Sequence, residues 1–287
     1  MKRRIAVAAG VTSAGAVLLL SGCGGTDTKS GSTGDIKLTA ADAVIKASEK
    51  TGKADTFKAD LTIADSAKGG SVHATGQFRL RPTLQFNATL DNVSTGGQGL
   101  SGLSGQAIFD GNTLYAKVPQ QFSQFVGGGK PWLKISVAQA QQQSGMDLRN
   151  VIDRIQQVDP AEQTKMFTAS KDVRKVGTES VDGTRTTHYQ GTVTVKEALQ
   201  QLNAQQRADA QKWLDRAGKS DQKMNFDLWV DSSNLPRKMV TKGAAAGGDS
   251  GTVTVLYRDY GKSFKVSPPP SDQVGDFSLQ GLFGKHN

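Results

Sequence analysis

The fold is decided by three consecutive segments in which apolar and polar residues alternate one by one: FKADLTI (57–63), VHATGQFRL (72–80) and LQFNATL (84–90). Alternation with a period of two is typical of a β-strand that has one apolar and one polar face. The dipeptide Arg81-Pro82 marks the turn between the second and third segments. Together the three segments predict an antiparallel sheet with one dry and one solvated face.

The same pattern continues along the chain. Further strands are predicted over residues 106–109, 113–118, 132–135, 174–181, 186–194, 223–230, 237–241 and 252–260. Two of the connections, Asp110-Gly111 and Asp182-Gly183, are typical hairpin turns. The glycine-rich residues 94–105 are expected to form a mobile loop, and Pro268 to Pro270 are expected to close the folded part.

Helices are predicted in four places. The first covers residues 40–50, capped by Thr39 and ended by Gly52. A second helix is predicted from Leu148, Val151, Ile152 and Ile155, which recur at helical spacing. A third begins at Asp159-Pro160. A fourth begins at a capping box formed by Thr194 and Glu197, and it carries Leu199, Leu202, Trp213 and Leu214. No helix alternates regularly with single strands, so a doubly wound parallel sheet is disfavoured. The sequence predicts an α+β domain with a large curved antiparallel sheet and helices on its dry face.

The N-terminus has the features of a secretory signal peptide. Lys2, Arg3 and Arg4 precede an uncharged apolar run over residues 5–20, which is short for a membrane span. The run leads into LSGC (20–23), which holds the only cysteine of the 287 residues and resembles the lipobox of bacterial lipoproteins. That resemblance implies cleavage before Cys23 and a diacylglyceryl group on its sulfur. An ordinary signal peptide with a chance cysteine, or an uncleaved anchor, is the alternative.

Residues 24–34 have the composition of a flexible linker, with an end-to-end distance of about 20 Å as a random coil. The net charge is +9, of which the signal peptide carries +3, so the mature chain carries about +6. No run of five or six basic residues occurs, which argues against nucleic acid as a partner. A mild positive balance suits a position above anionic phospholipid, and equally suits a solvated surface.

No catalytic or metal-binding motif stands out. His73, His188 and His286 are scattered without zinc spacing, and neither HExxH nor a Gly-x-Ser-x-Gly elbow occurs. The carboxylates Asp227 and Asp231 flank a strand with no evident catalytic partner. We therefore predict no enzyme activity, no catalytic residue, no metal, and no cofactor other than the covalent lipid on Cys23. A hydrolase stays open because spatial clusters are hidden in a sequence.

The chain resembles the LppX/LprA/LprF/LprG family of actinobacterial envelope lipoproteins, whose fold is similar to that of the periplasmic carrier LolA. The resemblance covers about residues 38–275 and is carried by the following segments: LSGC (20–23), FKADL (57–61), FDGNTLY (109–115), THYQGTV (187–193), DLWVD (227–231), LPRK (235–238), YG (260–261) and VSPPP (266–270). It implies a half-barrel sheet closed by helices around an apolar cavity that holds acyl chains. The glycine-rich insert at 94–105 and the Ala-Gly loop at 243–248 depart from the family pattern. The mouth of the expected cavity therefore need not match that of the family.

The apolar residues of the dry face can fill a core or line a cavity. Packed interiors are the rule, so the residues alone favour a core, whereas the resemblance favours a cavity. If a cavity exists, its predicted lining is Phe57, Leu61, Ile63, Phe78, Leu80, Phe86, Leu90, Met224, Phe226 and Leu228, with Leu148, Ile152 and Ile155 from a helical lid.

These observations predict four regions: a lipoprotein signal peptide (1–22), a lipidated Cys23 with a flexible linker (23–37), one lipid-binding-like domain (38–275) and a flexible tail (276–287). The predicted function is to bind and carry acylated lipids or glycolipids during cell-envelope transport, from the outer face of the cell membrane. We expect a monomer held to the membrane by its lipid anchor, with a membrane transporter as a further candidate partner. The alternative is a surface-anchored protein-binding or sensor module with no lipid cargo.

Overall fold

The computed structural model describes residues 39–65, 70–94, 104–136, 159–202, 222–243 and 251–277, together with 204, 207, 208 and 211. Residues Leu38–Asn287 form one compact unit, which holds every described helix and strand. Among the described residues, no helix is both long enough and apolar enough to cross a membrane. Cys23 and the predicted signal peptide and linker lie outside the described residues.

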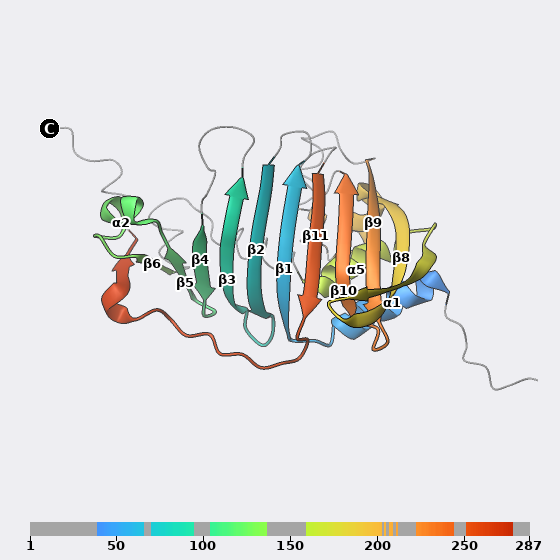
Figure 1. Cartoon of the computed structure of the whole chain (residues 1–287), viewed down its shortest axis with the longest axis horizontal. Helices are drawn as coiled ribbons and strands as arrows, with labels where there is room; N and C mark the ends of the chain where they lie inside the picture. The colour runs from blue at the N-terminus through green and yellow to red at the C-terminus, as the bar shows by residue number, and fades with distance from the viewer. Residues whose placement is uncertain are drawn as a thin grey trace, which may run out of the picture. The chain divides into compact units, whose positions relative to one another are not determined.

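A single open sheet forms most of this unit (Figure 1). Its strand order is β12-β6-β5-β4-β3-β2-β1-β11-β10-β9-β8-β7. The strand bounds are β1 Thr56–Asp65, β2 Gly70–Arg79, β3 Gln85–Ser94, β4 Gly105–Phe109, β5 Thr113–Lys117, β6 Trp132–Ser136, β7 Arg174–Val181, β8 Thr184–Thr194, β9 Lys223–Asp231, β10 Pro236–Gly243, β11 Gly251–Arg258 and β12 Val274–Asp276.

The pairing of β1 with β11 divides the sheet into two halves. Strands β1 to β6 follow one another to one side of this seam, and β11 back to β7 follow to the other side. We call them the N-terminal half and the C-terminal half. Each face of the sheet takes alternate residues of every strand. The face that carries Phe57 and Phe226, and on which the helices pack, is called the inner face.

The predicted α+β fold with a large curved sheet and helices on one face is confirmed, and two expectations are corrected. The sheet is not antiparallel throughout, because β12 pairs with β6 in parallel. The folded part also does not close at Pro270. The 3-10 turn η2 (Ser271–Gln273) follows directly, and the amide of Phe277 still donates to the carbonyl of Lys134 at 3.2 Å. Pro268 to Pro270 lie between β11 and β12, and prolines in such a connection do not prevent a strand from starting a few residues later.

Three helices pack on the inner face of the C-terminal half, behind β8 to β11 in Figure 1. They are α1 (Ala40–Thr51), α5 (Pro160–Phe167) and α6 (Val195–Gln200). The predicted caps are present: Thr39 with Asp42 and Thr194 with Glu197 form complete capping boxes, and Asp159 accepts from the amide of Ala161. Helix α6 is shorter than predicted, since it ends at Gln200; Trp213 and Leu214 lie outside the described residues.

A short helix that the sequence did not reveal, α2 (Gln120–Val126), lies near the β6 edge of the sheet (Figure 1). Its N-cap is Pro119, which offers no side chain to cap the first amides. With seven residues and no capping signal, such a helix has little local signature and depends on its surroundings. Val126 and Ser123 are buried and attach it to the unit.

Candidate functional site

The inner face of the N-terminal half is built from rows of side chains that run across the strands. The first row is aromatic. Phe57, Phe78 and Phe86 are neighbours on β1, β2 and β3, with ring centroids 5.2 Å and 6.0 Å apart, and Phe109 of β4 stacks on Phe86 at 5.6 Å. All four rings are buried. They form a packed layer at one end of the sheet.

The next row consists of small residues. The strand register aligns the members in the order Ala59, Gly76, Ala88, Ala107 and Ala116, on β1 to β5. All but Ala59 are only partly buried. A Cβ atom on Gly76 would lie 2.7 Å from the Phe78 ring, so this position has room only for glycine. We call this set the small-residue row.

Beyond the small-residue row the inner face is apolar again. Leu61, Ala74 and Leu90 align on β1 to β3, and Ile63, Val72 and Val93 align one step further. All six are partly buried, in contrast to the aromatic row. The N-terminal half therefore has apolar surface that neighbouring side chains do not fully cover.

The inner face of the C-terminal half is closed instead. Phe226 of β9 stacks on Phe167 of α5 with ring centroids 4.2 Å apart and planes at 3°. Phe167, Phe226 and Leu228 have no measurable exposure, and Met239 is 2% exposed. Helix α1 contributes Val44 and Ala47 to the same cluster, α5 contributes Phe167 and α6 contributes Ala198. This half is a solid core.

The predicted cavity-lining residues fall into two groups, one buried and one partly buried. All ten described members lie on or beside the inner face, as the alternation predicted. Eight of them belong to the buried apolar cluster or pack against it, and Ile63 and Leu90 lie on the same face further along their strands. The buried members are Phe57, Phe78, Phe86, Met224, Phe226 and Leu228, and the partly buried ones are Leu61, Ile63, Leu80 and Leu90. Leu148, Ile152 and Ile155 lie outside the described residues. Whether these residues line a lipid cavity stays a prediction.

The small-residue row was missed as a candidate site because the prediction selected large apolar side chains. The sequence did contain a signal for this row, because Ala59, Gly76 and Ala88 occupy dry-face positions of the three alternating segments 57–63, 72–80 and 84–90. Ala107 and Ala116 join them only through the pairing of β3, β4 and β5. At Ala88, Ala107 and Ala116 the small side chains leave room against the sheet that large side chains would fill, whereas at Gly76 the Phe78 ring takes that room.

Two buried tyrosines lie beside the seam between the halves. The hydroxyls of Tyr257 and Tyr260 have no hydrogen-bond partner among the described residues, and their rings are 6.2 Å apart. Burial, followed by the nearby Asp159, raises the pKa of Tyr257 well above its usual range. Burial likewise raises the pKa of Asp159, which caps α5. These groups bring polarity to one end of an otherwise apolar interior.

The outer face carries the two described histidines, and each is held by carboxylates on both ring nitrogens. His188 Nδ1 lies 2.9 Å from Glu179 and Nε2 lies 2.8 Å from Asp227, while its ring stacks on Trp229 at 4.1 Å. His73 lies between Asp60 and Asp91 in the same way, at 3.0 and 3.1 Å.

The two carboxylates that had no evident catalytic partner in the sequence thus both have ionisable partners. Asp227 contacts His188, and Asp231 binds the guanidinium of Arg237 at 2.6 Å. The indole N–H of Trp229, followed by His188, lowers the pKa of Glu179. When both ring nitrogens of a histidine contact carboxylates, neither is free to take a proton from a nucleophile. The arrangement of these two clusters is therefore that of structural contacts. Among the described residues, no group of three or more His, Cys, Asp or Glu side chains is arranged to hold a metal ion.

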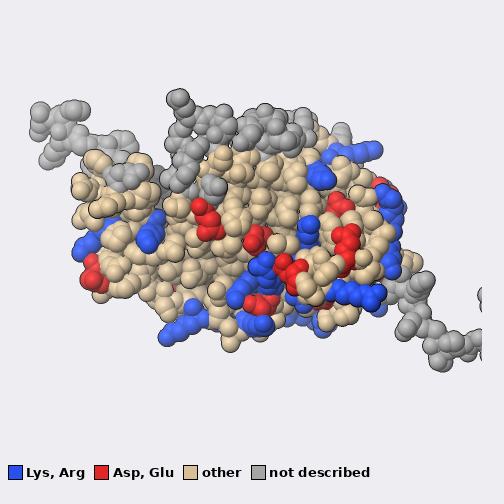
Figure 2. Space-filling model, viewed as in Figure 1, with Lys and Arg blue, Asp and Glu red and all other residues tan. Residues whose placement is uncertain are grey.

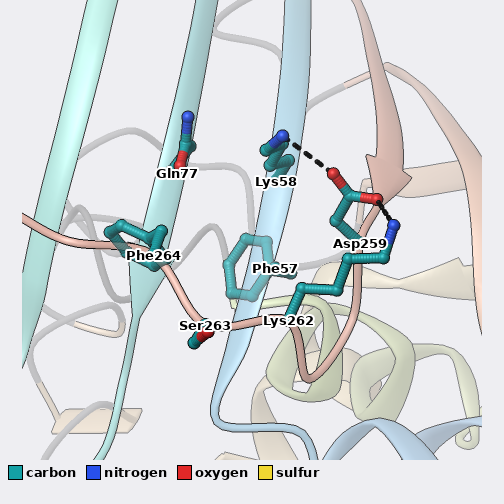
Figure 3. Close-up of a pocket in the computed structure, with 7 residues that line it drawn as sticks. All are labelled: Phe57, Lys58, Gln77, Asp259, Lys262, Ser263 and Phe264. Atoms are coloured by element: carbon teal, nitrogen blue, oxygen red, sulfur yellow. Dashed lines mark hydrogen bonds and ion pairs between the residues drawn. The ribbon is translucent and has the colours of Figure 1, made fainter.

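A small pocket of about 100 Å³ lies where the segment after β11 crosses β1 and β2 (Figure 3). Lys58 and Lys262 flank Asp259 there and lower the pKa of its carboxyl to about 2, Lys262 having the larger effect. Small-molecule sites usually enclose about 300–1,000 Å³. This pocket is too small and too polar to hold an acyl chain.

The fold has a clear counterpart among solved structures. The crystal structure of LprF from Mycobacterium bovis superposes with a TM-score of 0.51 at 14% identity, over 80% of this chain and 96% of that one. The chain has the fold of LprF. The resemblance to the LppX/LprA/LprF/LprG group is thereby confirmed for the architecture. The lipoprotein LppX of Mycobacterium tuberculosis superposes with a TM-score of 0.46 at 12% identity, covering 79% of this chain and 98% of LppX.

Two Streptomyces proteins are similar in sequence, and no family model matches. A lipoprotein candidate of Streptomyces coelicolor, SCO4650, is 27% identical over 241 residues, which cover 83% of this chain and 75% of that protein. An uncharacterized 31.2 kDa protein of Streptomyces griseus, from the rplA-rplJ intergenic region, is 34% identical over 153 residues. That match spans 52% of this chain and 49% of the S. griseus protein.

Proposed function

We propose that this chain is an exported lipoprotein, held to the membrane through Cys23, that binds acylated lipids or glycolipids and carries them during cell-envelope transport. The cargo chain would lie on the inner face of the N-terminal half. Binding and release would be the whole mechanism, with no bond made or broken.

The observation that carries this proposal is the accessible apolar surface of the N-terminal half. The small-residue row and the partly buried Leu61, Ile63 and Leu90 form one continuous area beside the aromatic row. Each methylene removed from water contributes about 0.8 kcal/mol. An acyl chain of about 16 carbons would then contribute on the order of 10 kcal/mol before entropy losses, because apolar burial scales with area.

The chemistry of the outer face supports binding over catalysis. His73 and His188 each have both ring nitrogens within hydrogen-bond distance of carboxylates. General-base catalysis needs a free nitrogen within reach of the group to be deprotonated. A carrier needs only the apolar inner face and a rigid sheet behind it.

The anchor is supported by the LSGC segment and by the S. coelicolor relative, which its name describes as a lipoprotein candidate. Two acyl chains on Cys23 would hold the protein stably, whereas one chain gives only marginal membrane binding. Replacing Cys23 with Ser in the expressing cell should release the protein from the membrane fraction. A Cys23→Ser protein that still sediments with membranes would contradict the anchor.

Native mass spectrometry of a chain that begins at residue 24 tests the cargo. We expect species heavier than the chain by the mass of one or more lipids, which disappear after solvent extraction and return when the extract is added back. A protein that is lipid-free as purified and takes up no lipid afterwards would instead support a surface-anchored binding or sensor module without cargo. The six predicted lining residues that are packed in the core are the observation that keeps this second function open.

A further inference from the structure

Helix α2 presents two large apolar side chains to solvent. Phe125 is 52% exposed and Phe122 is 49% exposed, which with Val176 at 50% are the three highest values among the large apolar side chains that the structure describes. The two side chains are three residues apart on the helix, so they are neighbours on its surface. An exposed aromatic pair of this kind is costly in water unless another surface covers it.

The sequence around α2 is uncharged at its centre and basic at its ends. Residues 118–129 contain no Lys, Arg, Asp or Glu, and Lys117 and Lys130 flank them. The Lys117 ammonium lies over the Trp132 ring at 5.9 Å, and Lys130 donates to the backbone carbonyl of Asp272 at 2.7 Å. In the described part of the chain neither ammonium is paired with a carboxylate. Aromatic side chains between lysines are typical of segments that lie in a membrane interface.

The size of the patch distinguishes a membrane from a second copy of the chain. A fully buried phenylalanine removes roughly 150–250 Å² from water, so two half-exposed rings offer on the order of 200 Å². A stable dimer needs about 800 Å² from each partner. The patch is therefore too small to hold two protein molecules together. A bilayer needs no such area, because two aromatic side chains with lysines beside them give a weak, reversible contact that does not require the anchor.

We propose that α2 is a second, reversible membrane contact. Phe122 and Phe125 enter the boundary between headgroups and acyl chains, while Lys117 and Lys130 lie beside anionic headgroups. This contact would fix which end of the sheet faces the bilayer, an orientation that the predicted linker after Cys23 would leave open. The inference uses neither the lipid on Cys23 nor any cargo, so it can fail while the proposed function holds, and the reverse.

Vesicle flotation with a chain that begins at Leu38 tests the contact without the anchor. This chain contains the whole compact unit with every described helix and strand. We expect it to bind vesicles of phosphatidylglycerol and phosphatidylcholine, and to bind pure phosphatidylcholine less, because the lysines lose their anionic partners. The Phe122→Ala/Phe125→Ala double variant should bind at least tenfold more weakly. An Ile45→Ala/Val176→Ala variant, which removes two exposed apolar side chains elsewhere, should bind like the parent.

A spectroscopic readout places the helix directly. Phe125→Trp should add tryptophan emission that shifts to shorter wavelength when vesicles are added, beyond any change in the parent chain. Circular dichroism of every variant verifies the fold, which surface substitutions should leave intact. Vesicle binding that is absent in the parent, equal in the double variant, or unaccompanied by a shift at position 125 would overturn the proposal. So would a concentration-dependent dimer that the double variant abolishes, since it would assign the patch to a second copy.

Discussion

The two halves of the sheet present the same face of the same strand pattern, but only the C-terminal half is filled along its whole inner face. In the C-terminal half, α1, α5 and α6 pack on the inner face, and the Phe167–Phe226 stack closes it. In the N-terminal half, the small-residue row and the apolar residues beyond it keep part of their surface accessible. We infer that stability and the proposed lipid binding depend on different regions of one sheet.

This division has a physical basis. A fully packed interior stabilises a fold because each buried apolar side chain contributes about 1.5–3 kcal/mol relative to its exposed state. A binding surface for hydrocarbon must leave such contacts unmade until the ligand arrives. A single sheet can do both if one half, together with the aromatic row of the other, supplies the core of the unit.

The largest effect should come from opening the filled half. Phe226→Ala removes a ring with no measurable exposure and leaves a cavity against Phe167. We expect a loss of about 3–5 kcal/mol in the free energy of unfolding, typical of phenylalanine truncation in a core. Urea unfolding followed by circular dichroism measures it. A loss below about 1 kcal/mol would mean that the C-terminal half is not the core that stabilises the unit.

Filling the accessible half should abolish binding at small cost to stability. Ala107→Phe places a ring in the middle of the small-residue row, where a cargo chain would lie. We expect lipid uptake to fall at least tenfold, with unfolding within about 1 kcal/mol of the parent. Gln106→Phe, one residue away on the outer face, is the matched control and should bind normally.

The same substitution distinguishes the two readings of the inner face. If the N-terminal half were a packed core, the extra ring at Ala107 would overpack it and destabilise the unit by about 1–3 kcal/mol. Unchanged lipid uptake together with such a loss would remove the contrast between the halves.

Shortening an accessible side chain should act more weakly. Leu61 is partly buried and lies in the row beyond Ala59. Leu61→Ala should lower the affinity for an acylated ligand by about three- to tenfold, because it removes about 1 kcal/mol of apolar contact. Its effect on unfolding should stay well below that of Phe226→Ala. Equal destabilisation by the two variants would contradict the division.

Much of the fold could be predicted from local sequence patterns, whereas the candidate site could not, because it is formed by pairing between distant segments. The boxes at Thr39 and Thr194 and the alternation in β1 to β3 are local signals, and the structure has them where predicted. The seam between β1 and β11 joins residues nearly 200 positions apart, and nothing local encodes it. Ala107 and Ala116 acquire their place in the small-residue row only from strand register. Local propensity also gives no signal for α2 or for the parallel pairing of β12.

The smallest effect concerns the acid stability of the helices that fill the C-terminal half. Glu197 caps α6, and hydrogen bonds from Lys171 and then Thr194 lower its pKa from 4.5 to about 2. A carboxyl with a lowered folded-state pKa stabilises the fold fully above its unfolded pKa, and this contribution is lost as the pH falls from about 4.5 to about 2. Glu197→Gln keeps the hydrogen bonds of a capping box but has no charge to titrate. We therefore expect the midpoint of thermal unfolding to fall less steeply over this pH window in the variant than in the parent, with equal slopes above pH 5. Since Glu197 is partly exposed, the difference should be small, and identical curves at all pH values would show that this charge does not stabilise the helices on the C-terminal half.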